Sequence, residues 1–159
     1  MDSQTDAILF HLLTAQRIAS LGTLRGGIPN VSMVLFAASP DFQHFYLHMS
    51  RLAQHTQDLL SDPRAGLMVS EPDERMKDPQ TLARISMLGE VVKLDPSANG
   101  AFSKAREAYL LRFPQARANF LLGEFSLYAF EVESARFVAT FGKIFNLKPG
   151  DLKRVAENG

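Results

Sequence analysis

The sequence contains no cysteine among its 159 residues. This absence excludes disulfide bonds, thiol nucleophiles and metal sites with cysteine ligands. Long hydrophobic runs are also missing, since no apolar stretch reaches the roughly 20 residues that a membrane-spanning helix requires. The N-terminus carries Asp2 and Asp6 and no basic segment before an apolar core, so it does not resemble a signal peptide. We therefore expect a cytoplasmic protein that has no membrane partner.

An excess of charge of one sign is missing as well. Lys and Arg together number 17, and Asp and Glu together also number 17. Without a basic block, the chain lacks the attraction to phosphates that dominates nucleic-acid binding, so we expect no nucleic-acid partner. The hydrophobic fraction of 46% is ordinary for a globular protein, and the length suits one domain over residues 1–159.

The chain also lacks the short motifs that mark several classes of enzyme. It has no Gly-x-Ser-x-Gly elbow, no phosphate-binding P-loop and no Gly-x-Gly-x-x-Gly. His44 and His48 share one face of a predicted strand, but four residues of strand span roughly 13 Å, too far for one metal ion. We predict no metal site and can assign no catalytic residue. Candidates by residue type alone are Tyr46, His48, Arg84 and Tyr128.

What the sequence does contain is a series of short apolar runs separated by turn residues. The run over residues 5–20 has helical spacing, and Asp2, Ser3 or Thr5 could cap it. The run over 31–38 is almost wholly apolar, which predicts a strand buried on both faces. Residues 81–94 alternate with period two, and Gly89 within them suggests a bulge.

The remaining runs complete the expected fold. We expect strands over residues 21–24, 42–49, 65–69 and 144–147, and a hairpin of 125–132 with 135–140. Helices are expected over 50–61, from either 95 or 101 to 113, and over 115–122, with a loop over 71–80 and a short polar tail after 151. Strands this regular favour a meander that closes as a barrel. The predicted fold class is mainly β with flanking helices (α+β).

The junction at Ser50 carries the clearest candidate site. A predicted strand stops there and a helix begins, and a serine at such a point can cap the helix through its side-chain oxygen. The same junction presents backbone N–H groups and the positive end of a helix dipole, which suit an anion. Arg51 and His55, four residues apart, would share a face near that end. Spacing alone leaves both readings open, a plain helix cap and an anion site.

Two other segments combine a cation with unusual surroundings. Arg84 lies within an otherwise apolar strand, so either its stem packs at a sheet edge or its guanidinium lines a polar cavity and pairs with an anion. Phe141-Gly142-Lys143 places an aromatic ring, a permissive glycine and a cation between two strands. This pattern is typical either of a strand corner or of a ligand contact.

Several short segments occur in one order along the chain. They are Leu21-Gly22-Thr23-Leu24, Gly27-x-Pro29-x-x-Ser32, His48-Met49-Ser50-x-Leu52-Ala53-x-His55-Thr56, Asp62-Pro63-Arg64, Arg84-Ile85-x-x-Leu88-Gly89 and Phe141-Gly142. This series resembles the pyridoxamine 5′-phosphate oxidase-like family with the FMN-binding split β-barrel, over roughly Leu12 to Leu147. The Ser-x-Leu-Ala-x-His-Thr run and the late Phe-Gly are similar to its haem-utilisation branch.

The resemblance implies a homodimer that binds FMN in a cleft between subunits, and an oxidoreductase that acts on an unidentified small molecule. The cofactor-binding residues that it implies are Ser32, Met33, Val34, Met49, Ser50, Gln54, His55, Thr56, Arg84, Phe141, Gly142 and Lys143. It also leaves two alternatives, a haem-binding or haem-degrading protein and a flavin-binding module without catalysis.

This sequence departs from the family pattern in several places. In the oxidases proper, arginine and lysine hold the phosphate, whereas here the matching positions are Ser32, Ala37, Gln54 and His55. We therefore expect weaker FMN retention and no vitamin B6 substrate. Haem-degrading relatives use a C-terminal histidine as iron ligand, but this chain has none after His55. The same haem ligation is therefore not expected.

Overall fold

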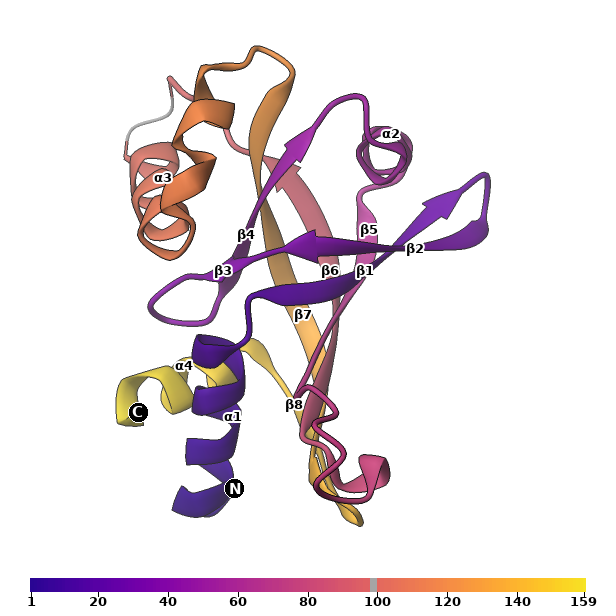
Figure 1. The fold of residues 1–159 in the computed structure, drawn as a ribbon, viewed down its shortest axis with the longest axis vertical. Coiled ribbons are helices and arrows are strands. Elements are labelled where there is room, and N and C mark those ends of the chain that lie inside the picture. The colour runs from indigo at the N-terminus through magenta and orange to yellow at the C-terminus, as the bar shows by residue number, and fades with distance from the viewer. Residues whose placement is uncertain (98–99) are drawn as a thin grey trace.

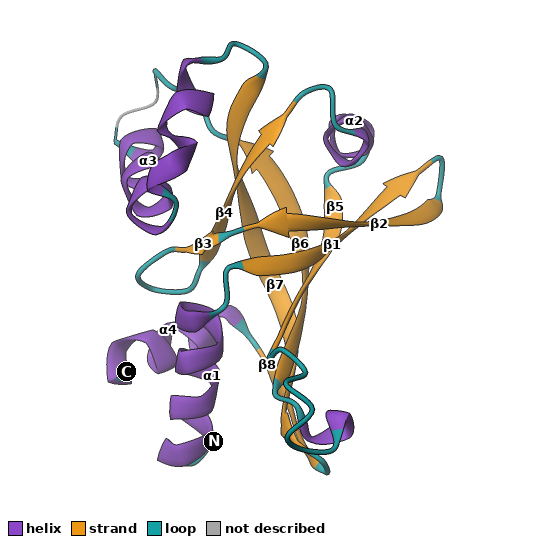
Figure 2. Cartoon of the chain, in the orientation of Figure 1, coloured by secondary structure: helices purple, strands orange, loops and turns teal. Residues whose placement is uncertain are grey.

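The computed structural model describes residues 1–97 and 100–159. In Figure 1 a long, strongly curled sheet forms the body of the molecule, α3 and α2 stand at one end, and α1 and α4 lie together at another side. Figure 2 shows that strands make up the body and that the helices flank it. This architecture confirms the predicted fold class, a curled sheet with flanking helices that matches a split barrel.

The helices and strands have the following bounds. They are α1 (Ser3–Ala15), β1 (Ile18–Arg25), β2 (Ile28–Leu35), β3 (Ala37–Ala38), β4 (His44–Ser50), α2 (Gln54–Ser61), β5 (Arg64–Ser70), the 3-10 turn η1 (Pro79–Thr81), β6 (Arg84–Lys93), α3 (Ala101–Arg112), the 3-10 segment η2 (Pro114–Leu121), β7 (Phe125–Thr140), β8 (Lys143–Leu147) and α4 (Pro149–Asn158). Among the described residues, no helix is long and apolar enough to cross a membrane.

The strand order explains why the sheet curls. The order is β2-β1-β5-β6-β7-β4-β3, with β8 paired to β7, and every pairing is antiparallel. The two outermost strands of this order, β2 and β3, follow one another in the chain with Phe36 between them. A sheet whose first and last strands are joined by one residue must bend until its ends meet, which is the geometry of a barrel.

The alternation predicted for residues 81–94 is confirmed in β6. Ile85, Met87, Gly89 and Val91 are buried on the inner face, and the residues that alternate with them, Ser86, Leu88 and Glu90, are exposed. The register of β6 against β7 shifts between Leu88 and Gly89, as the bulge prediction requires. A side chain at Gly89 would collide with the backbone carbonyl of Glu131, so glycine is needed for this close approach of the strands.

The prediction that residues 31–38 are buried on both faces is wrong. Val31 is 70% exposed and Met33 is 68% exposed, whereas Val34 and Phe36 face the core. The strand lies at the edge of the sheet order, and only its inner face is covered. A strand that is apolar on both faces is predicted from its sequence to be buried on both. Here the described residues of the single chain leave the outer face of this edge strand uncovered.

The hairpin predicted around Glu133 and Ser134 is also wrong, because β7 is one strand of 16 residues. Leu88 pairs with Ser134 and Gly89 pairs with Val132, so Glu133 is an extra residue on β7 opposite that step. Two polar residues in succession therefore mark a bulge in a continuous strand. The hairpin turn comes later, between β7 and β8.

The chain ends differ from the prediction too. The tail after Asp151 forms α4, whose Leu152 and Val155 are buried in the core. The first helix is capped by Asp2, one of the three predicted caps, but ends at Ala15, and residues 18–20 belong to β1. Of the two predicted starts for α3, the later one is right, with Gly100 as N-cap. Ala98 and Asn99, within that prediction, lie outside the described residues.

Candidate functional site

The candidate site begins where β4 ends at Ser50. Arg51, Leu52 and Ala53 form a turn before α2 starts at Gln54, and the Ser50 hydroxyl accepts a hydrogen bond from the backbone N–H of Leu52 at 3.1 Å. The helix is preceded by Ala53 as N-cap, with no side-chain hydrogen bond. The prediction that Ser50 caps the helix is therefore wrong, because three turn residues separate the serine from the first helical turn. Arg51 accordingly lies outside the helix face that it was predicted to share with His55.

No side chain in the described part of the chain caps the first turn of α2. Gln54 and His55 occupy the first helical positions, where backbone N–H groups have no acceptor within the helix. Thr56 is completely buried, and its hydroxyl has no hydrogen-bond partner among the described residues. Burial lowers the pKa of half-buried His55, so its imidazole is neutral near pH 7. These groups together offer N–H and O–H donors to an anion.

One turn further along, Asp58 fixes α2 to the β1–β2 hairpin. Its carboxylate accepts from Thr23 Oγ1 at 2.9 Å, Arg25 Nε at 3.2 Å, Asn30 Nδ2 at 3.2 Å and Gln54 Nε2 at 2.9 Å. The hydrogen bond from Gln54, followed by that from Thr23, lowers the pKa of this buried carboxyl. Its amide partner Gln54, a predicted cofactor contact, has its side chain engaged by Asp58.

The three predicted contacts on β2 do not share one face. Ser32 pairs with buried Leu21 and Val34 pairs with buried Ala19, so both point inward, whereas Met33 points outward. The free edge of β2 nevertheless exposes backbone groups, because β1 is its only partner in the sheet order over the described residues. A planar ligand along this edge would meet backbone donors and acceptors and the side chain of Met33.

Exposed apolar side chains on four neighbouring strands form one surface, which we call the outer apolar face. Met33 pairs with Ser20, and Ser20 pairs with Met68. The next row runs from Val31 through two glycines to Leu88. The members of the outer apolar face are Ile18, Val31, Met33, Leu35, Met68 and Leu88, all exposed. A contiguous apolar surface of this kind typically marks an interaction site.

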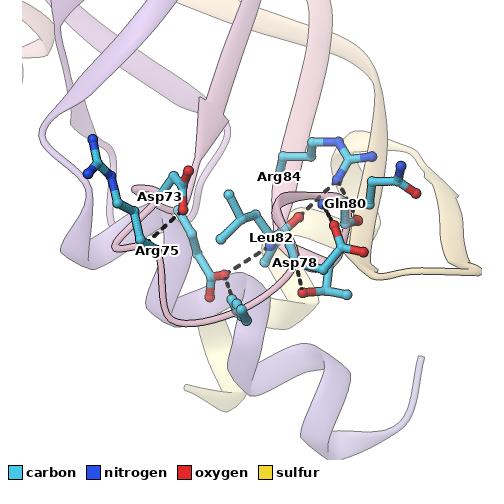
Figure 3. Close-up of polar contacts among 10 residues, drawn as sticks. Asp73, Arg75, Asp78, Gln80, Leu82 and Arg84 are labelled. Atoms are coloured by element: carbon cyan, nitrogen blue, oxygen red, sulfur yellow. Dashed lines mark hydrogen bonds and ion pairs between the residues drawn. The ribbon is translucent and has the colours of Figure 1, made fainter.

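Arg84 is turned back toward its own loop. Figure 3 shows its guanidinium at the start of β6, where it donates to the carbonyl of Leu82 at 3.0 Å and to that of Gln80 at 3.4 Å. Asp78 stabilises the same loop by accepting from the backbone N–H of Gln80 at 2.9 Å. In this conformation Arg84 supports the β5–β6 connection. A role on a ligand would require its guanidinium to leave these carbonyls.

Phe141 and Gly142 form the turn of the β7–β8 hairpin, and Lys143 is the first residue of β8. Gly142 has a φ of 79°, a conformation that glycine adopts without strain, and Phe141 is 72% exposed. This placement agrees with the strand-corner reading. The turn also leaves an aromatic ring and the Lys143 ammonium at the surface, where a second molecule can reach them.

The predicted residues fall into two separate groups in one chain. Met49, Ser50 and the start of α2 lie near the strand end where Arg64 pairs with Glu90. Arg84 pairs with Ser70, at the other end of the same two strands. The six residue steps of β6 from Arg84 to Glu90 span roughly 20 Å. The chain alone therefore does not bring Arg84 and the β7–β8 turn to the start of α2.

Among the candidates for proton transfer, His48 is packed into an aromatic cluster. The His48 ring stacks on Phe120 with centroids 3.8 Å apart and meets Tyr109 edge-on at 5.6 Å. Burial lowers the pKa of His48 to about 4 and raises that of Tyr109 to about 12. Burial also raises the pKa of Tyr46 and of Tyr128. The imidazole and the three tyrosine hydroxyls are therefore neutral near pH 7, which suits a structural role.

The curled sheet, its uncovered outer face and the strand-to-helix junction define a split-barrel protein of the pyridoxamine 5′-phosphate oxidase-like class. Within that class the chain belongs to the CREG beta-barrel family, whose sequence profile matches residues 8–151. This match covers every predicted site residue. The resemblance inferred from the ordered motifs is thereby confirmed.

Individual relatives differ in what they bind. The chain is 34% identical over 121 residues, or 75% of its length, to the non-canonical heme oxygenase HOZ of Arabidopsis thaliana, and spans 34% of that protein. A heme binding protein from Mycobacterium smegmatis has a similar fold, with a TM-score of 0.85, 21% identity and coverage of 97% of this chain and 62% of that one. A Clostridium acetobutylicum protein of the pyridoxinephosphate oxidase family also has a similar fold, with a TM-score of 0.68 and 14% identity. The match covers 96% of this chain and 99% of that one. The chain thus spans about a third of the curated relative that it matches.

Proposed function

We propose that this protein is an FMN-binding flavoprotein that acts as a homodimer and as an oxidoreductase on a small molecule. The observation that carries the proposal is the uncapped start of α2 with the buried, unpartnered Thr56 hydroxyl inside it. Such a hydroxyl needs an acceptor or donor to offset its burial, and a phosphate oxygen at the helix start supplies one. The cytoplasmic location and the lack of nucleic-acid and membrane partners stay predictions.

The residues present fit the phosphate end of FMN in kind, though without strong cations. Ser50, His55 and Thr56 would hold the phosphate together with the backbone N–H groups of the first helical turn. Bound FMN would supply the electron-transfer chemistry. The protein would position it and exclude water from its phosphate. Because His55 is neutral and Gln54 is engaged by Asp58, we expect FMN to be held loosely.

A second copy of the chain would complete the site. The outer apolar face provides a surface for self-association, since burying it removes exposed methionine, valine and leucine side chains from water. A two-fold partner could bring Arg84 and the β7–β8 turn to the α2 end of the other subunit, which one chain cannot do. Met33, on the outer apolar face, would then lie beside both the partner and the ligand.

We predict that Thr56→Val weakens FMN binding about tenfold, because valine keeps the shape of threonine and removes the hydroxyl that meets the phosphate. The measurement is a fluorescence titration of FMN into the purified protein. Ser61→Ala is the matched control, since Ser61 lies exposed in the last turn of the same helix. Equal FMN affinities of Thr56→Val and the unchanged protein would mean that this helix start has only a structural role.

A reductant screen separates an oxidoreductase from a flavin-binding module without catalysis. The FMN-loaded protein would be mixed with nicotinamide nucleotides and with other small reductants, and loss of the oxidised flavin spectrum followed by reoxidation in air would be recorded. Turnover with one reductant supports the oxidoreductase. Binding without turnover with any of them supports the module.

Haem binding is a second candidate, and the identity to the Arabidopsis heme oxygenase favours it. His55 suits an axial ligand because burial keeps its imidazole neutral and it lies half-buried at the candidate site. The test is a haem titration followed at the Soret band, compared between the unchanged protein and His55→Ala. A Soret band that depends on His55 favours this candidate, whereas a spectrum identical to free haem rejects it.

A further inference from the structure

A cleft lies apart from the proposed FMN site. It has a volume of about 860 Å³ and is bounded by α3, the outer face of β4 and the β3–β4 loop. In Figure 1 α3 and α2 stand on either side of β4, so this cleft and the start of α2 are separate places on the molecule. We call it the α3 cleft. Nothing in the proposed FMN chemistry uses its residues.

Three alanines contribute to the room in the α3 cleft, beside larger lining side chains such as Leu94 and Leu111. Ala101, Lys104 and Ala108 line it from one face of α3, while Ala105 and Tyr109 on the other face are buried against the sheet. Its floor includes Ala129 on β7. An alanine at these positions leaves space that a larger residue would fill. The alanines are therefore part of the reason that the cleft is open.

Aromatic rings form part of the floor. His44 and Tyr46 lie side by side on β4 with their rings inclined by only 2° and their centroids 6.3 Å apart. Both line the cleft, and both are half-buried. The two rings are parallel, and the Tyr46 ring contributes apolar surface to the floor. The face of tyrosine also attracts a positive charge.

The charges around the cleft are unequal. Asp41, Glu107 and Glu131 contribute three carboxylates, and Lys104 is the one lysine or arginine among the lining residues. Burial opposes ionisation of Asp41, but hydrogen bonds from Ser39 Oγ at 2.6 Å and Gln43 N at 3.1 Å keep its pKa below the ordinary value. The cleft is therefore negatively charged near pH 7. An anion such as a phosphate would be repelled there.

We propose that the α3 cleft binds a small organic cation with an apolar body. The ammonium group lies toward the carboxylate of Glu131, which pairs with His44 across the β4–β7 ladder. The apolar part of the ligand lies against Tyr46 and the alanines. This binding does not depend on FMN, so it stands or falls independently of the proposed function.

The test is an amide-resolved NMR titration of the whole chain with three probes of one shape. These probes are naphthylmethylammonium, its neutral analogue naphthylmethanol and the anion naphthoate. We expect the cation to bind about tenfold more tightly than the alcohol, the alcohol to bind more tightly than the anion, and the largest shifts at Tyr46, Lys104 and Ala129. Equal affinities for the three probes, no binding of any, or shifts centred elsewhere would overturn the proposal.

Amino-acid substitutions test whether the ligand binds in the α3 cleft. Glu131→Gln should weaken binding of the cation about threefold and leave the alcohol unchanged. Glu133→Gln is the matched control, because Glu133 is an exposed carboxylate on the same strand outside the cleft. Ala108→Leu should fill the cleft and abolish binding of all three probes, with a thermal melt to show that the protein is folded. Equal effects of Glu131→Gln and Glu133→Gln would contradict the assignment.

Discussion

At the scale of single residues, Thr56 and Asp58 on α2 have opposite hydrogen-bonding states. Both are buried, yet the Asp58 carboxylate accepts from four side chains and the Thr56 hydroxyl has no partner among the described residues. Burying an unpartnered polar group costs free energy. The anchor at Asp58 holds the helix in place, and in the proposed function a phosphate oxygen would offset the energetic deficit at Thr56.

The pH dependence of stability tests the anchor at Asp58. Its folded-state pKa lies below the ordinary value of 3.8, so its contribution to stability is present above that value and is lost as the pH falls through the lower folded value. We predict that Asp58→Asn lowers the free energy of unfolding at neutral pH and that the difference from the unchanged protein shrinks toward zero in acid. Urea unfolding over a pH series measures both.

The control for this pH series is Asp73→Asn. Asp73 lies on the exposed β5–β6 loop, where its carboxylate accepts from the backbone N–H of Arg75 at 2.9 Å. Its replacement should leave stability nearly unchanged at neutral pH. A deficit of Asp58→Asn that keeps the same size at every pH would mean that the carboxylate charge does not stabilise the fold.

At the scale of elements, α4 shows what a local sequence pattern misses. Its residues include charged groups and a Pro-Gly pair, which predict an unstructured polar tail. The helix nevertheless places Leu152 and Val155 in the core, and Arg154 forms an ion pair with Asp6 of α1. Two buried side chains per helix are too few for a clear periodic signal. Packing on α1 and the sheet supplies the stability that the segment alone lacks.

The contribution of α4 can be measured at Leu152. We predict that Leu152→Ala lowers the free energy of unfolding by about 2–4 kcal/mol, because it removes a completely buried side chain and leaves a cavity. Urea unfolding at neutral pH measures the change. Leu121→Ala is the matched control, since Leu121 is 84% exposed and its truncation should change stability by less than about 0.5 kcal/mol. A small effect at Leu152 would show that α4 is not part of the folded core.

The sequence predicts an element correctly where the local pattern of buried and exposed residues determines its structure. The alternation of β6, the irregular register at Gly89 and the end of α3 before Pro114 all follow from local patterns. The prediction fails where distant partners decide. The strand over 31–38 needed knowledge of its edge position, and the bulge at Glu133 needed the register against β6.

The same distinction applies to the candidate site. Spacing pointed to the junction after Ser50, and Thr56 was among the residues predicted there. The role of Asp58 could not be predicted, because its partners Thr23 and Asn30 are 35 and 28 residues away in the chain. The engagement of Arg84 by loop carbonyls likewise depends on the conformation of the loop. That conformation is fixed by Asp78, which binds the backbone of Gln80.

At the scale of the whole molecule, the outer apolar face is the largest departure from the sequence-based expectation. Residues that were predicted to lie in a core are instead exposed on one side of the barrel. The two groups of predicted cofactor contacts lie at opposite ends of β6 in one chain. Self-association through this face would account for both features, since it would cover the apolar residues and would join the two groups across the proposed dimer.

A charge on this face should prevent self-association. We predict that Met33→Glu converts the dimer to a monomer at micromolar concentration, because dimerisation would bury an unpaired carboxylate. Size-exclusion chromatography with light scattering measures the mass. The matched control is Met76→Glu, in which the same charge replaces a methionine that is 85% exposed on the β5–β6 loop. Identical masses for both variants would place the interface elsewhere.

The central claim is that FMN binds in a site that two copies of the chain form together. Analytical ultracentrifugation of the protein with FMN, recorded at the flavin absorbance, tests this claim most directly. We predict that the bound flavin sediments with a dimer at one FMN per chain, and that Met33→Glu loses the flavin together with the dimer. Flavin that stays unbound, or that sediments with a monomeric chain, would contradict the account.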